Sequence, residues 1–257
     1  PWANPTITTP YFVTVTDGNG CSDVDSVTVT VNPLPLVDAG SDKVICFGDT
    51  VVIGGSPSGP AGAVFAWNPA TEISNTADAN PAVWPAADAS YTLIVTDTNG
   101  CMNTDTVDIV VNALPAANAG TDTTLCFGDC AQLNASGGVQ YDWTPASGLN
   151  NPNISNPIAC PADATVYIVA VTDINSCVNT DTVNVFVNPL PPADAGADVQ
   201  ICIGDSVQLN ASGGISYTWA PASSLDDPNV FNPWANPTIT TPYFVTVTDG
   251  NGCSDVD

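Results

Sequence analysis

The sequence predicts an all-β protein built from tandem sandwich domains, and three observations predict it. Residues that favour strands and turns (Val, Thr, Asn, Asp, Gly and Pro) dominate, whereas strong helix formers other than Ala are scarce. Apolar and polar residues alternate in short runs, as in Val207, Leu209 and Ala211. The same order of motifs recurs three times along the 257 residues, so repetition rather than length sets the domain count.

An internal repeat organises the whole chain. Residues 1–25 are identical to residues 233–257, so the sequence re-enters itself 232 residues later. Three units fill that distance, and we expect the parent protein to carry this three-unit block more than once. The units open at Asp38-Ala39-Gly40, Asn118-Ala119-Gly120 and Asp194-Ala195-Gly196.

The repeat gives four predicted domains. Residues 1–33 are the C-terminal part of a repeat, and residues 36–112 and 116–188 are complete repeats. Residues 192–257 form a repeat that lacks its last strand, for which residues 26–35 show the expected continuation. Short proline-rich linkers separate the repeats, and proline stiffens such connectors, so we expect a semi-rigid rod.

Each unit contains the same series of turns and strands in the same order. A first strand such as Asp42–Cys46 precedes a Gly-Asp turn, and a Ser-Gly-Gly turn leads into the motif Tyr-x-Trp-x-Pro in units two and three. A Pro- and Asn-rich stretch, a strand opening on Tyr, a tight turn such as Asn99-Gly100 and a last strand such as Thr106–Val111 follow. Seven or so strands per unit fit an immunoglobulin-like sandwich. The recurrent aromatic residues are predicted core residues: Trp67, Trp143 and Trp219, with Tyr91, Tyr167 and Tyr243.

The charge of the chain excludes several classes of partner. There are 26 acidic residues against one basic residue, Lys43, and no His, giving a formal net charge of −25. Nucleic acid and anionic membrane surfaces both require Lys and Arg to neutralise phosphate, so neither is an expected partner. Such a charge keeps the chain soluble and repels further copies in dilute salt.

Nine cysteines at recurrent positions predict disulfides and an oxidising, extracellular compartment. The middle unit alone adds Cys130 and Cys160, which appear together and are absent together, so we expect them to bond each other. Cys21 belongs to the incomplete first unit and is expected to lack a partner. The recurrent cysteines of the three units are Cys46 and Cys101, Cys126 and Cys177, and Cys202 and Cys253.

Two pairings are open for the recurrent cysteines. In a plain immunoglobulin topology the two positions lie at opposite ends of a domain, whereas a disulfide needs Cα atoms within about 7 Å. Either the segment after the hairpin folds back and the pair closes within a unit, or the bond crosses to the next unit. We favour pairing within a unit, because each unit then holds a matched pair. A crossing bond would join Cys46 to Cys177 and Cys126 to Cys253.

The motifs together resemble a known family. The pattern ICxGDxVxLxxSGG…YxWxPA…NPxxxP…TxYxVxVTDxNGC…DxVxVxVNPLP resembles the PKD-like and immunoglobulin-like repeats of giant cell-surface proteins of Bacteroidota, including gliding adhesins and surface filaments exported by type IX secretion. The resemblance covers the whole chain. It implies adhesion, or the construction of long extracellular fibres.

The sequence offers candidates for three kinds of chemistry. Asp97 and Asp17 open loops that look like the start of a calcium loop, with Asp38 or Asp105 as further ligands, but no unit supplies the six oxygens of a full loop, so only weak Ca²⁺ binding is considered. Ser and Thr hydroxyls that follow Asp look like the O-glycan acceptors of proteins in that phylum. The candidate O-glycan acceptors are Ser26, Thr50, Thr106, Thr123, Thr182 and Ser206.

The paired carboxylates Asp226-Asp227 could imitate the catalytic pair of a glycosidase. Acids that recur on hairpins form a solvated surface instead, and we predict no enzyme.

The predicted function is structural: a repeat shaft of a cell-surface fibre or adhesin, with neighbouring repeats and further copies as partners. The alternative is a carbohydrate- or surface-binding module that uses exposed aromatic residues such as Trp2, Trp84 and Trp234. A binding module should leave these side chains exposed on one face, whereas a shaft should bury them at contacts between domains.

Overall fold

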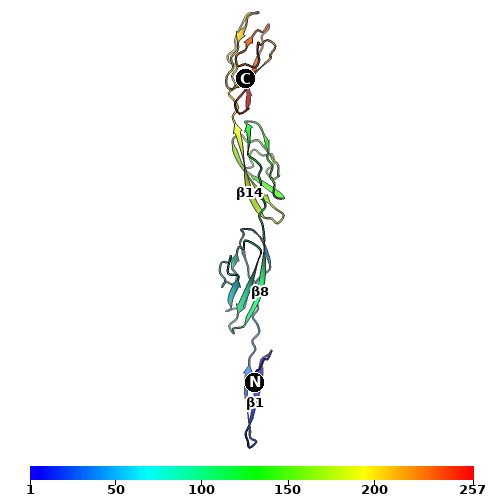
Figure 1. Cartoon of the computed structure of the whole chain (residues 1–257), viewed down its shortest axis with the longest axis vertical. Helices are drawn as coiled ribbons and strands as arrows, with labels where there is room; N and C mark the ends of the chain where they lie inside the picture. The colour runs from blue at the N-terminus through cyan, green and yellow to red at the C-terminus, as the bar shows by residue number, and fades with distance from the viewer. The chain divides into compact units, whose positions relative to one another are not determined.

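The computed structural model describes all residues 1–257, and its regular structure consists of 19 strands. It contains no helix that could span a membrane. The chain divides into two compact units, Pro1–Leu114 and Pro115–Asp257 (Figure 1). Each unit is described by itself below.

The first unit begins with a two-stranded hairpin and continues into repeat 1. Strands β1 (Thr9–Thr16) and β2 (Ser22–Val29) pair antiparallel over their whole length. Repeat 1 has a four-stranded sheet in the order β3-β8-β7-β5 and a second layer formed by β4 and β6. The strands of repeat 1 are β3 (Lys43–Cys46), β4 (Val51–Val52), β5 (Val64–Asn68), β6 (Ala82–Val83), β7 (Ala89–Thr96) and β8 (Met102–Asn112).

The second unit holds repeats 2 and 3. Repeat 2 copies the topology of repeat 1, with a sheet in the order β11-β13-β14-β9 and the pair β10-β12. Repeat 3 has the smaller sheet β16-β18-β19 and the pair β15-β17. The strands of repeat 2 are β9 (Thr123–Cys126), β10 (Ala131–Gln132), β11 (Gln140–Thr144), β12 (Ile158–Ala159), β13 (Thr165–Thr172) and β14 (Val178–Asn188); those of repeat 3 are β15 (Val207–Gln208), β16 (Ser216–Ala220), β17 (Trp234–Ala235), β18 (Phe244–Thr248) and β19 (Ser254–Val256).

Each repeat encloses its own hydrophobic core between the two layers. Alternate residues of the central strands point inward, as in β13, where Tyr167, Val169 and Val171 are fully buried. Trp143 lies beneath them at 1% exposure and donates its indole N–H to the carbonyl oxygen of Ile154 at 3.0 Å. The predicted core role of the aromatic residues is confirmed for the three tryptophans and for Tyr91 and Tyr167, because all five are buried.

The strands of the second layer are shorter than the alternation of the sequence suggests. Repeats 1 and 2 have six strands each, and β15 stops at Gln208 although Ala211 is buried further along. Isolated bridges such as Leu149 to Ala159 continue the layer beyond its named strands. Proline- and asparagine-rich segments interrupt the ladder, because proline donates no backbone hydrogen bond.

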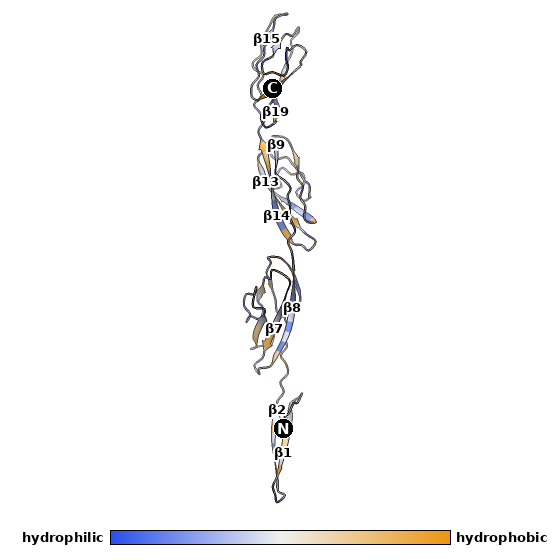
Figure 2. Ribbon diagram, viewed as in Figure 1, coloured by the Kyte–Doolittle hydropathy of each residue, from blue (hydrophilic) through white to orange (hydrophobic).

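The N-terminal hairpin shows what the sandwich contributes to burial. Its residues are identical to those of β18 and its surroundings, yet Val13 and Val15 are 55% and 64% exposed whereas Val245 and Val247 are fully buried. Figure 2 shows apolar residues along β1, where a soluble domain normally hides them. The difference arises because no second layer covers the hairpin.

Candidate functional site: the disulfide-linked ends of the repeats

Every repeat has a proximal end, where the chain enters it, and a distal end, where the chain leaves. In repeat 2 the distal end is built by β9, which pairs in parallel with the end of β14 so that Cys126 lies opposite Asn188. The amide of Phe127 donates to the carbonyl of Asn188 at 2.8 Å and extends this pairing. Cys126 therefore lies where the chain passes into the linker to repeat 3.

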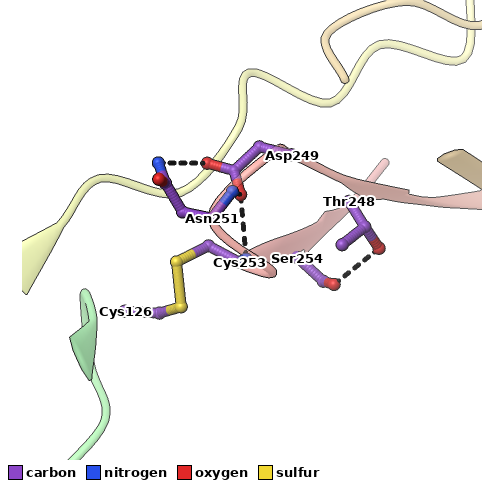
Figure 3. Close-up of a disulfide and its surroundings, with 6 residues drawn as sticks. All are labelled: Cys126, Thr248, Asp249, Asn251, Cys253 and Ser254. Atoms are coloured by element: carbon purple, nitrogen blue, oxygen red, sulfur yellow. Dashed lines mark hydrogen bonds between the residues drawn. A yellow bond between two sulfur atoms is a disulfide. The ribbon is translucent and has the colours of Figure 1, made fainter. Parts of the chain in front are cut away.

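The proximal end of repeat 3 is built by the turn between β18 and β19. The backbone N–H groups of Asn251 and Cys253 donate to one carboxylate oxygen of Asp249 at 2.8 and 2.9 Å, and the amide of Asp249 donates back to the carbonyl of Cys253 (Figure 3). Desolvation raises the pKa of Asp249, but the hydrogen bonds from Cys253 and Asn251 outweigh it, so the pKa lies below its ordinary value. The turn therefore holds Cys253 in a fixed position.

A disulfide joins these two ends. Cys126 bonds Cys253 with a Cα–Cα distance of 5.5 Å, across 127 residues of sequence (Figure 3). The bond runs in parallel with the linker, so repeats 2 and 3 are connected by two covalent routes. Its geometry lies within the usual range for disulfides.

The preferred pairing within a unit is therefore wrong for Cys126, and the reason is strand length. Cys126 lies opposite Asn188 at one end of β14, whereas Cys177 precedes Val178 at the other. The 11 residues of β14 at about 3.3 Å each separate the two cysteines by roughly 35 Å. No disulfide spans that distance, so the segment after the hairpin would have to unfold to reach Cys126.

The other cysteines fall into two groups. Cys46 and Cys177 are disulfide-bonded, and Cys21 is free. Cys101 and Cys202 are also free, which corrects the expectation that each closes a bond within its own unit.

The extra pair of repeat 2 bonds as its joint appearance suggests. Cys130 and Cys160 are joined with a Cα–Cα distance of 4.3 Å. They lie just outside the antiparallel pair of β10 and β12, whose ladder brings the two chain segments together. The bond closes a loop across a sequence separation of 30 residues.

Replacing both Cys130 and Cys160 with serine should destabilise repeat 2. A loop of that size gives a chain-entropy contribution of about 3–4 kcal/mol. Hydrogen exchange of β10 and β12 should therefore accelerate in the variant, while exchange in repeat 3 stays as in the wild type. Equal exchange in β10 and β12 of the two proteins would show that the bond adds no stability to the repeat.

The candidate calcium ligands already accept backbone hydrogen bonds: Asp17, Asp38 and Asp97 within their own turns, and Asp105 from the opening of repeat 1. One carboxylate oxygen of Asp97 accepts from the amides of Asn99 and Cys101, and Asp17 does the same in the hairpin. An oxygen of Asp105 accepts from Ala39, and one of Asp38 accepts from Gly40. No group of three or more His, Cys, Asp or Glu side chains gathers where it could hold a metal ion. The same turn role belongs to Asp226, which accepts from Asp227 and Trp234.

The sequence reasoning missed the structural role of one recurrent aspartate, which it considered only in repeat 1, where Asp105 was a candidate calcium ligand. Asp181 accepts the amide of Ala119 at 2.8 Å, which holds the opening of the repeat onto β14. The hydrogen bonds from Ala119 and Thr182 lower its pKa. Asp105 and Asp257 make the same bond in repeats 1 and 3, to Ala39 and Ala195. The signal was its recurrence four residues after the second cysteine of each unit.

The candidate glycan acceptors and aromatic residues lie at the surface to different degrees. Thr123 is half-buried in β9, and the other five hydroxyl residues are exposed. Trp84 and Trp234 are 45% and 50% exposed, and Trp2 is fully exposed. These tryptophans are therefore not buried, which is the outcome expected of a binding module rather than of a shaft.

Comparison with known proteins identifies no family for this chain. No family model matches the sequence, and no curated protein matches it. Among solved structures, a three-domain immunoglobulin segment of titin (an E-to-A mutated variant) is similar over 98% of this chain and 97% of its own, at 10% identity and a TM-score of 0.39. The insect immune protein hemolin is similar over 99% and 91%, at 10% identity and a TM-score of 0.32. The eight N-terminal immunoglobulin domains of the Down Syndrome Cell Adhesion Molecule are similar over 93% and 44%, at 14% identity and a TM-score of 0.29.

The sheets, their strand order and their separate cores define the class on their own evidence. The chain is a tandem immunoglobulin-like β-sandwich protein. Its disulfides assign it to an oxidising, extracellular setting.

Proposed function

We propose that the chain is part of the structural shaft of a long extracellular fibre or adhesin at the cell surface, of the type carried by giant Bacteroidota surface proteins with PKD-like repeats. Its partners are the neighbouring repeats and further copies in a filament. Nucleic acid, anionic membranes, cofactors and catalysis have no part in this role. The net charge of −25 supports the exclusion of polyanionic partners.

The observation that carries the proposal is the disulfide between successive repeats. A shaft must transmit tension without lengthening, and a folded repeat held only by its linker lengthens when it unfolds. The bond between Cys126 and Cys253 removes the residues between them from the path of tension, because the force passes directly through the two sulfur atoms. Bonds of this kind limit the extension of a shaft even when a repeat unfolds.

Single-molecule stretching tests this role. With handles at Ala113 in the linker and at Asp257, breaking the bond releases a segment of 127 residues, of which 30 stay bypassed by the intact Cys130–Cys160 bond. The 97 residues that remain add roughly 320–350 Å at 3.3–3.6 Å per residue. The expected result is that chains with Cys126 and Cys253 both replaced by serine extend that much further than the wild type. The matched control replaces Cys130 and Cys160, whose loop lies inside the bypassed segment and should add no length. Equal extension of all three proteins would contradict the shaft role.

The exposed tryptophans favour the alternative, a module that binds carbohydrate or another surface. Stacking of a sugar on Trp84 or Trp234 needs an accessible ring, and both rings are about half exposed. Glycan-array binding that is lost in the Trp84→Ala and Trp234→Ala variants would support this alternative. Neither substitution should change the extension measured in the stretching experiment, so the two functions are tested separately.

A further inference from the structure

Two tryptophans lie on the outer face of the second layer of the sandwich. In repeat 1, Val83 of β6 is fully buried and Trp84, which follows it, is 45% exposed. In repeat 3, Ala235 of β17 is fully buried and Trp234, which precedes it, is 50% exposed. Because successive side chains of a strand point to opposite faces, both indoles lie on the side of the layer away from the core and the main sheet.

A carboxylate lies beside the tryptophan of repeat 1. The bridge between Ile73 and Val83 places Glu72 opposite Trp84, and the amide of Trp84 donates to the carbonyl oxygen of Glu72 at 3.0 Å. Oε1 of Glu72 accepts from the amide of Ala86 at 3.3 Å, which holds the carboxylate along this segment. Oε2 makes no hydrogen bond within the chain and can accept one from a ligand.

A carboxylate lies beside the tryptophan of repeat 3 as well. The bridge between Leu225 and Ala235 places Asp226 opposite Trp234. Oδ1 of Asp226 accepts from the amides of Trp234 and Asp227 at 2.7 and 2.8 Å, so Oδ2 is available to a ligand. Directly opposite residues of antiparallel strands have Cβ atoms about 4.5–5.5 Å apart, which is close enough for one ligand to contact both side chains.

A third side chain completes each row. The pairing of β15 with β17 places Gln208 on the other side of Trp234, and the pairing of β4 with β6, continued by one residue, places Thr50 on the other side of Trp84. Nε2 of Gln208 donates to the carbonyl oxygen of Asn232 at 3.2 Å, which leaves its Oε1 as an acceptor. We call these the two tryptophan rows: Thr50, Trp84 and Glu72 in repeat 1, and Gln208, Trp234 and Asp226 in repeat 3.

The carboxylate of repeat 3 is not required by the fold of the layer. Asn150 takes the place of Asp226 in repeat 2, and its Oδ1 accepts from the amide of Ile158 at 2.8 Å. In repeat 1, Oγ of Ser74 accepts from the amide of Ala82 at 3.0 Å. An uncharged oxygen therefore forms this bond where the outward residue is not tryptophan, and a carboxylate forms it where that residue is tryptophan.

The carboxylate of repeat 1 follows the same rule. Glu72 is the only glutamate of the chain, and its φ of +57° is disfavoured for an L-residue. Gly148 takes its place in repeat 2, opposite Cys160, and Ser224 takes it in repeat 3, opposite Asn236. A carboxylate therefore accompanies the tryptophan in both rows, and in repeat 1 it does so at a strained backbone position of the kind found at binding sites.

We propose that each tryptophan row binds a pyranose that carries a free amino group, as in a polymer of glucosamine. The apolar face of the sugar ring stacks on the exposed indole, and its ammonium group pairs with the carboxylate. The hydroxyl groups of the sugar hydrogen-bond to Thr50 or Gln208. The net charge of −25 attracts a cationic sugar and repels sugar acids and sulfated glycans.

This binding role goes beyond the proposed shaft and assigns a ligand class to side chains that the shaft does not use. A shaft that carries such rows holds amino-sugar polymers along its side. The rows contain no cysteine, so failure of this proposal would leave the stretching result of the Cys126–Cys253 bond unchanged.

Calorimetry of the full chain tests the ligand class with two matched probes. The first is a β-linked hexamer of glucosamine, and the second is the same hexamer with every amine acetylated, which removes the positive charges. At a pH of about 5.5 the Asp and Glu side chains are ionised and the glucosamine amines are protonated. We expect two binding sites per chain for the first probe, and an affinity for the second that is about 10-fold lower or more, because a hydrogen bond to a charged group is lost.

Substitutions of the carboxylates test the residues. Glu72→Gln and Asp226→Asn each remove one charge with little change of shape, and an amide at position 226 can keep the turn bond as Asn150 does in repeat 2. Each should reduce the number of sites from two to one, and the double variant should bind no glucosamine hexamer. Asp163→Asn is the matched control, because its exposed carboxylate lies in repeat 2, which has no outward tryptophan. This control should bind the hexamer as the wild type does.

Absence of binding to the wild type, or equal affinity for the two hexamers, would overturn the proposal. So would a loss of affinity in Asp163→Asn as large as that in Glu72→Gln, which would show that the net charge alone holds the ligand. A chain with both Trp84→Ala and Trp234→Ala must also lose binding, since retained affinity would show that the indoles take no part.

Discussion

Replacing Trp143 with alanine is expected to unfold repeat 2 and to leave repeat 1 folded. The indole is 1% exposed and forms the centre of one core, and truncating a buried tryptophan costs about 3–5 kcal/mol. The substitution also leaves the carbonyl of Ile154 without its indole donor. A domain of this size has only a few kcal/mol of stability to lose.

Hydrogen exchange of the full chain measures this result repeat by repeat, which is needed because several repeats do not unfold as one two-state system. The amides of β11 to β14 should exchange at the rates of an unfolded chain, whereas those of β3 to β8 should keep their protection. Trp84→Ala is the matched control, since that side chain is 45% exposed and its loss should leave protection in repeat 1 near the wild-type level. Retained protection in β13 and β14 of the Trp143 variant would show that the indole does not hold the core.

The sequence was sufficient to predict the sandwich because its signals are local and repeated. Alternation along residues 165–172 identifies β13, and the recurrence of a Trp and a Tyr in each unit identifies the core pair. Repetition supplies what a single copy cannot, since a pattern found three times at one position reflects a structural requirement. The fold class, the core tryptophans and two buried tyrosines follow from such patterns.

The disulfide register could not be predicted from spacing, because it depends on which ends of two domains meet. The sequence contains a matched pair of cysteines in each unit, which favours closure within the unit. Only the parallel pairing of β9 with β14 places Cys126 at the distal end of its repeat. The register of the strands in three dimensions therefore determines which cysteines pair. The proposed function depends on that pairing.

The identical segments at the two ends of the sequence show that side-chain burial also depends on three-dimensional contacts. Val13 and Val245 occupy one sequence context, but their exposures are 55% and 0%. Local sequence sets the strand and its alternation, whereas the burial of a side chain needs a second layer. No pattern within the 25 residues could predict that difference.

Gly137→Ala is expected to detach the opening of repeat 2 from its Ser-Gly-Gly turn. Gly137 has a φ of +108°, and a Cβ there would lie 2.1 Å from the carbonyl oxygen of Ala116. An L-residue in such a conformation costs about 1–3 kcal/mol, and the overlap with backbone adds to that cost because no flexible side chain can move aside. The mutual backbone hydrogen bonds of Asn118 and Ser136 lie next to the overlap, so exchange of these two amides should accelerate by about 100-fold or more, which corresponds to roughly 3 kcal/mol.

Gly128→Ala separates the steric cost from the conformational one. Gly128 also has a positive φ, at +92°, but nothing lies within 4 Å of its would-be Cβ. Its substitution therefore carries the cost of the backbone conformation alone, about 1–3 kcal/mol, and should leave exchange of Asn118 and Ser136 close to the wild-type rate. Gly213→Ala provides an independent copy of the test, since its Cβ would lie 2.0 Å from the carbonyl oxygen of Pro192. If the Gly137 and Gly128 variants accelerate those two amides equally, the close approach of linker to turn does not hold the repeat's opening. If Gly137 and Gly213 act alike and Gly128 does not, this contact anchors repeats 2 and 3 to the linkers that precede them.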